Sequence, residues 1–106
     1  MSDSDSLNKN DSEAFLKLEH DLVSANVNVA KLAILDMMKE QNKKIVIDMG
    51  KVQQIDPYGV SLLVAASNSI RRSGKILKLI NVPLSLMEIF DFFRMNKHFA
   101  IEFQNA

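Results

Sequence analysis

The 106-residue chain contains no cysteine, which excludes disulfide bonds, thiol nucleophiles and cysteine-ligated zinc sites. It has only two histidines, His20 and His98, so the ligand set of an ordinary zinc site is also missing. The three glycines are scattered along the chain and do not form a glycine-rich phosphate-binding loop. From these shortages we predict neither a bound metal nor a cofactor.

An excess of charge of one sign is also missing, because 13 basic residues balance 13 acidic ones and the formal net charge is zero. Proteins that bind nucleic acids normally carry a basic face, so we expect no nucleic-acid partner. No apolar run approaches the roughly 18 residues of a membrane-spanning helix, and the polar first ten residues lack the apolar core of a signal peptide. We therefore expect a cytoplasmic protein without membrane insertion.

Apolar residues make up 47% of the chain, which is typical of a globular protein, and the length suits one domain. Residues 1–12 are mostly Ser, Asp and Asn, so we predict a flexible N-terminal tail and a single domain over 13–106. Hydrophobic patterning predicts strands at 14–22, 45–49, 75–80 and 99–103, alternating with helices at 27–41, 57–73 and 83–95. This order of elements favours parallel strand pairing.

The junction at residues 54–60 is the most informative stretch, because an apolar strand ends there and an apolar-periodic helix begins. Asp56 is a strong helix N-cap, and Pro57 suits the first helical position, where its missing N–H is not needed. At about 100° per residue, one arc of this helix faces the core: Gly59, Leu62, Leu63, Ala66 and Ile70. The opposite arc is small and mildly polar: Tyr58, Ser61, Ala65, Asn68, Ser69 and Arg72.

The last helix has its own apolar pattern. Its predicted core stripe is Leu86, Ile89, Phe90 and Phe93. Met87, Phe92 and Met95 project off that stripe, either as core at the helix edge or as an exposed apolar patch of the kind that marks partner sites.

Two carboxylates, Asp48 near the end of the second predicted strand and Asp56 at the junction that follows, raise the question of acid–base or Mg²⁺ chemistry. Neither a nucleophile nor a general base accompanies them, so the set of roles that an active site needs is not filled. We interpret Asp56 as a helix cap and the two histidines as surface or partly packed side chains. The chain is therefore not expected to be an enzyme.

Several motifs together resemble a known family. Residues 45–49, Val52, residues 55–60 and residues 62–63 are similar in order and spacing to the signature of STAS domains, found in bacterial anti-sigma factor antagonists and their relatives. Residues 18–27 and 71–82 extend the resemblance to about 14–103. It implies a single-domain STAS-like α/β fold over 13–106, with a mixed, mostly parallel sheet of four to five strands and three to four helices.

The resemblance has two departures. In anti-sigma factor antagonists, the third residue of the turn that opens the helix is a Ser or Thr phosphorylated by the partner kinase. Here that position is Tyr58, preceded by Pro57, and a serine/threonine kinase can use neither; Ser61 is the nearest hydroxyl on the helix. Tyr58 is then a docking residue, a structural residue or a tyrosine phosphosite. His20 stands where the family has a glycine.

The resemblance implies a regulatory binding module, an anti-sigma factor antagonist that acts by partner switching on an anti-sigma factor with a kinase-like ATPase. Its implied partner-binding residues are Asp56, Pro57, Tyr58, Gly59, Ser61, Ala65, Asn68 and Arg72. Small STAS proteins are also similar to a subunit of phospholipid-transport ABC complexes that binds the ATPase, which is the alternative. A structural or dimerising adaptor is the third possibility.

Overall fold

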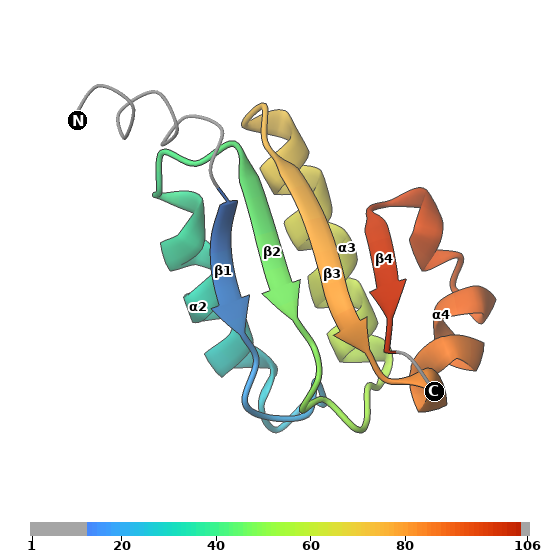
Figure 1. The fold of residues 1–106 in the computed structure, drawn as a ribbon. Coiled ribbons are helices and arrows are strands. Elements are labelled where there is room, and N and C mark those ends of the chain that lie inside the picture. Colours follow the sequence, from blue (N-terminus) through green and yellow to red (C-terminus); the bar gives the residue numbers. More distant parts are fainter. Residues whose placement is uncertain (1–12, 105–106) are drawn as a thin grey trace.

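A computed structural model of the chain describes residues 13–104, so the tail predicted at 1–12 lies outside the described residues. Within residues 13–104 the chain forms four strands and three α-helices (Figure 1). The strands are β1 (Glu13–Lys17), β2 (Lys44–Asp48), β3 (Ile76–Val82) and β4 (Ala100–Phe103). The helices are α2 (Val27–Met38), α3 (Pro57–Arg72) and α4 (Met87–Phe92), with short 3₁₀ helices η1 (Leu84–Leu86) and η2 (Met95–Lys97) beside α4.

The described strands form one sheet in the order β1-β2-β3-β4, and each neighbouring pair is parallel. This confirms the predicted single α/β domain, and the four described strands lie within the predicted range. β1 and β4 are the edge strands of the described sheet, as the alternating patterns of their residues indicate.

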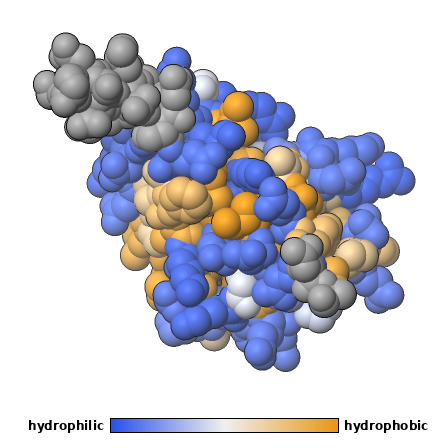
Figure 2. All heavy atoms as spheres, in the orientation of Figure 1, coloured by the Kyte–Doolittle hydropathy of each residue, from blue (hydrophilic) through white to orange (hydrophobic). Residues whose placement is uncertain are grey.

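Within residues 13–104, the two long helices α2 and α3 lie on the same face of the sheet. In Figure 1, α2 and α3 lie behind the strands, where Ile45, Ile47 and Leu79 are fully buried against them. The front face carries the alternate side chains, and Phe15 and Ile76 on it are 62% and 60% exposed. Figure 2 views this face and shows apolar side chains set among polar ones. Parallel sheets are normally covered on both faces, so an open face is unusual.

Two predicted elements are shorter than expected. β1 ends at Lys17, although its alternation continues to Leu22, which forms only an isolated bridge with Ile55. Helix α2 ends at Met38, three residues before the predicted end. The Lys75 ammonium donates to the Met38 carbonyl oxygen at 3.0 Å and also to the Glu40 carbonyl oxygen, and so stabilises the negative end of the helix.

The predicted helix at 83–95 is wrong as a continuous element. It divides into η1 and α4, and Arg94 then adopts a left-handed backbone with φ 53 that ends the helix before η2. Phe93 is the C-cap just after α4, and it is 38% exposed instead of forming part of the core stripe. Met95, expected off that stripe, is fully buried.

Candidate functional site

The first turn of α3 is held by the cap that the sequence predicts. Asp56 has an extended backbone (φ −113, ψ 178), and its carboxylate Oδ1 accepts a hydrogen bond from the Gly59 N–H at 3.0 Å. Pro57 occupies the first helical position. The Gly59 N–H is the main cause that lowers the pKa of Asp56, and the Ser24 N–H lowers it further. The carboxylate is therefore charged at neutral pH and fixed to the helix start.

The same carboxylate joins α3 to a second loop. Asp56 Oδ2 accepts from the Ser24 N–H at 2.8 Å, 32 residues away in the sequence. Asp21 does the reverse, because its Oδ1 accepts from the Gln53 N–H at 2.8 Å and from the Gln54 N–H at 3.3 Å. Each loop thus supplies one carboxylate that binds the backbone of the other. We call residues 21–24 and 53–56 the loop clamp.

Backbone hydrogen bonds complete the loop clamp. The Leu22 N–H donates to the Gln54 carbonyl oxygen at 3.0 Å, and the Asp56 N–H donates to the Leu22 carbonyl oxygen at 3.1 Å. Leu22 and Ile55 form the isolated parallel bridge between these bonds and are both buried. The start of α3 is therefore fixed to the β1–α2 loop through main chain as well as side chains.

Gly59 is required by how closely α3 approaches this loop. A Cβ placed on Gly59 would lie 2.2 Å from the Leu22 carbonyl oxygen and 2.8 Å from the Leu22 Cβ. Contacts under 3.0 Å are essentially never seen for real Cβ atoms, so any larger residue must displace the backbone. The sequence places Gly59 on the core face of the helix, but the close approach itself is a long-range contact that no local pattern indicates.

The outer arc of α3 is exposed to solvent as predicted. Tyr58 is 65% exposed, and most of the other residues of the arc are also exposed, whereas Ser69 is half-buried. We define the docking face as Pro57, Tyr58, Ser61, Ala65, Asn68 and Arg72. Residues 57–74 include no acidic side chain, and the helix ends in Arg71 and Arg72. The docking face therefore consists mostly of small side chains, with an aromatic ring at its start and positive charge at its end.

A family comparison now identifies the fold. The family model described as "Mlab, STAS domain" matches residues 6–102. The chain belongs to the STAS domain family. No curated protein matches it in sequence.

Solved structures share the fold of this STAS domain at low sequence identity. A candidate anti-sigma factor antagonist from Thermotoga maritima has a TM-score of 0.75 at 20% identity, over 85% of this chain and 78% of that one. An NMR structure of the same Thermotoga protein gives 0.73 at 18% identity, over 87% and 74%. A sulfate transporter family protein from Wolinella succinogenes gives 0.74 at 20% identity, over 87% and 77%. Identities this low show the fold alone.

The second carboxylate of the STAS domain has a local structural partner. Asp48 Oδ1 accepts from the Gly50 N–H at 2.8 Å and fixes the turn after β2. Within residues 13–104, no group of three or more His, Asp or Glu side chains is arranged to hold a metal ion. In the same part of the chain, no helix has the length and apolar character needed to cross a bilayer. Of the two histidines, His20 is exposed, and His98 is half-buried at the C-cap of η2.

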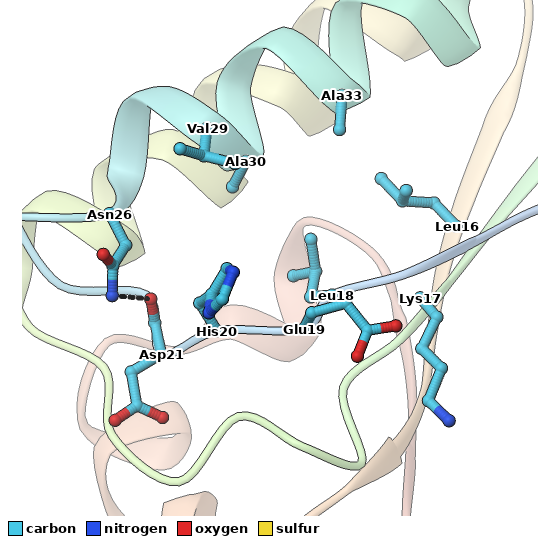
Figure 3. A pocket seen from close by; sticks show the side chains of 10 residues that line it. All are labelled: Leu16, Lys17, Leu18, Glu19, His20, Asp21, Asn26, Val29, Ala30 and Ala33. Carbon is cyan, nitrogen blue, oxygen red and sulfur yellow. Dashed lines mark hydrogen bonds between the residues drawn. The ribbon is translucent and has the colours of Figure 1, made fainter.

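A shallow hollow of about 200 Å³ lies between the β1 edge and α2 (Figure 3). Its apolar wall comes from Leu16, Leu18, Val29, Ala30 and Ala33, and its rim from Lys17, Glu19, His20, Asp21 and Asn26. Among the described non-glycine residues, only Asn81 and Arg94 have a positive φ. His20 therefore fits where the family has a glycine without a left-handed backbone.

The apolar patch considered on the last helix is only partly formed. Phe92 is 78% exposed and Met87 38% exposed, and the Phe92 ring packs edge-on against Phe93 at a centroid distance of 5.0 Å. Met95 does not contribute because it is buried in the core.

Proposed function

We propose that this STAS domain is a non-enzymatic binding module whose docking face engages an anti-sigma factor of the kinase-like ATPase type. Binding of the antagonist and of the sigma factor to that partner is mutually exclusive, so docking releases the sigma factor. The observation that supports this most is Tyr58, which is held in solvent by a helix start that the loop clamp fixes in place.

The physical properties of the docking face suit protein recognition. A partner that binds a preformed turn does not have to order it, so less binding energy is lost on association. Tyrosine is enriched among residues that contribute most to interfaces, since it offers a large contact area and a polar tip. The small side chains of Ser61 and Ala65 allow a partner to approach the helix closely, and Arg72 suits an acidic group on the partner.

The turn offers no hydroxyl that a serine/threonine kinase can use, because Pro57 and Tyr58 fill the two positions before Gly59. Ser61 is exposed one helical turn further on and is the remaining candidate phosphosite on this face. We therefore propose that the domain is permanently competent to dock. A phosphate at this helix start would repel an acidic partner surface through its negative charge.

The test is a calorimetric titration of the domain into a purified kinase-like ATPase encoded beside it in its genome. We expect Tyr58→Ala to weaken binding about 30-fold, the typical loss for an aromatic anchor. Ile76→Ala is the matched control, since Ile76 is 60% exposed but lies at the opposite end of the sheet. A wild-type domain that forms no complex refutes the pairing, and equal binding by both variants refutes the docking face.

The proposed loss of the phosphorylation switch has a separate test. The domain is incubated with the same ATPase and ATP, and its intact mass is measured, with Ser61→Ala in parallel. We expect no added phosphate on either protein. Phosphate on the wild type that disappears in Ser61→Ala would show that the switch has moved to Ser61 and would contradict permanent competence.

The second candidate function is a small STAS subunit that binds the ATPase of a phospholipid-transport ABC complex. The lack of a serine or threonine at positions 57 and 58 favours this function, because a permanent subunit needs no phosphorylation switch. The fold also occurs in a sulfate transporter family protein. Co-expression with an ABC ATPase and its permease separates the two functions, since a permanent subunit is expected to purify as a stable complex with and without ATP.

A further inference from the structure

β1 is an edge strand of the described sheet, and nothing in residues 13–104 pairs with its outer side. Such an edge presents unpaired backbone N–H and C=O groups to solvent, and another strand can add to it. β1 has no proline and no bulge to block that pairing. Within the described residues, the edge is therefore open to a second strand.

The order of side chains along β1 is self-complementary. Antiparallel pairing of two β1 strands about a two-fold axis through Phe15 places Glu13 opposite Lys17 of the second copy and Lys17 opposite its Glu13. Residue i then pairs with residue j and j with i, as a two-fold interface requires. Both cross-strand pairs unite opposite charges, which is the stabilising arrangement.

The charged side chains of β1 can form these ion pairs with a second copy. Within the described residues Lys17 makes no ion pair, and its side chain is exposed. Glu13 contacts Lys44 of the neighbouring strand at 3.3 Å, with both side chains partly exposed. A lysine from a second copy would therefore extend an existing row of charges across the sheet.

Apolar groups flank the edge on both sides of the sheet. Phe15 is 62% exposed on the open face, and the two-fold axis brings it against Phe15 of the second copy. On the helical side, Val29 is 60% exposed and lines the same hollow as Leu16 (Figure 3). Aromatic pairs across antiparallel strands stabilise pairing.

From these features we propose that two copies of this chain associate through antiparallel pairing of their β1 edges, centred on Phe15. The interface of a five-residue strand is smaller than a standard protein interface, so the dimer is weak and concentration-dependent. The proposal does not rest on the docking function, because it involves β1 and α2 and none of the docking face.

The first test is solution mass as a function of concentration on the full chain. We expect light scattering to report 12.0 kDa at low concentration and a rise toward twice that mass across the micromolar-to-millimolar range. Glu13→Lys and Lys17→Glu each create like-charge pairs, so each variant alone should dimerise at least about tenfold more weakly. Circular dichroism confirms that each variant is folded.

Mixing the two charge variants tests the register itself. In a mixed dimer, both cross-strand pairs again unite opposite charges, so the equimolar mixture should recover wild-type association. A wild type that stays monomeric at millimolar concentration overturns the proposal. A dimer that is insensitive to both substitutions, or a mixture that fails to recover, overturns the β1 pairing.

A cysteine scan gives independent evidence, because the natural chain has no cysteine to compete. Phe15 is the residue that the two-fold axis pairs with itself, so Phe15→Cys should form an intermolecular disulfide on mild oxidation. Ile76→Cys is the matched control on the same open face, with 60% exposure. Equal cross-linking of the two variants would show random collision and contradict the proposed pairing.

Discussion

Replacement of Gly59 by Ala tests the contact that fixes the docking turn. The new Cβ would lie 2.2 Å from the Leu22 carbonyl oxygen, and ordinary contact begins at 3.4 Å, so the two segments must separate by about 1 Å. Overpacking of this kind costs about 1–3 kcal/mol. Weakening of the two backbone hydrogen bonds of the loop clamp costs about 1 kcal/mol each. Alanine is the better helix former by about 1 kcal/mol, which leaves a net loss of about 3 kcal/mol.

The assay is urea and thermal unfolding followed by circular dichroism. A loss of about 3 kcal/mol corresponds to a fall in Tm of roughly 12–24 °C for a domain of this size. Gly74→Ala is the matched control: nothing lies within 4 Å of its added Cβ, but its φ of +79 penalises an L side chain. We expect that control to lose about 1–2 kcal/mol. A Gly59→Ala variant as stable as Gly74→Ala would refute the close-approach argument.

Three further predictions concern hydrogen bonds of the loop clamp and of the end of α2. The pKa of Asp56 is lowered from its ordinary value of 3.8. The charged carboxylate therefore stabilises the fold above that pH, and this stabilisation is lost as pH falls through the lower pKa of the folded state. In urea titrations, the difference in unfolding free energy between wild type and Asp56→Asn should shrink from pH 6 to pH 3. Asp21→Ala removes the acceptor of two backbone N–H groups and should lower the free energy of unfolding by about 1 kcal/mol. Lys75→Met keeps the aliphatic stem but removes the donor to the end of α2, and should cost about 1 kcal/mol and speed amide exchange there.

The sequence predicted those features that depend on interactions between residues close together in the chain. The Asp56 cap and Pro57 are interpretable from the sequence because the groups they satisfy lie within one helical turn. The buried β2 core follows from its run of β-branched residues. However, Val46 is 2% exposed although it lies on the face that α2 and α3 do not cover, in register with Phe15 and Lys78 of the neighbouring strands.

Interactions between distant segments were not predictable in the same way. Asp21 gave no signal as a backbone acceptor, because its partners lie 32 and 33 residues away. The left-handed Arg94 ended a helix that periodicity alone extended to Met95, and only its backbone angle reveals the break. The outer arc of α3 was predictable because helical period fixes which side chains share a face once one face is buried.

The two proposed surfaces are compatible in one assembly. β1 leads directly into the β1–α2 loop, and that loop holds the start of α3 through Leu22 and Ser24. The docking face lies on the outer side of α3, whereas β1 pairing would use the far edge of the sheet (Figure 1). A β1-paired dimer therefore leaves both docking faces free and presents two identical sites. Two sites on one dimer bind a multivalent partner more tightly than one site does, provided that the geometry lets both engage. Charge variants of β1 should consequently leave the affinity of a single docking site unchanged and lower only the avidity toward a dimeric partner.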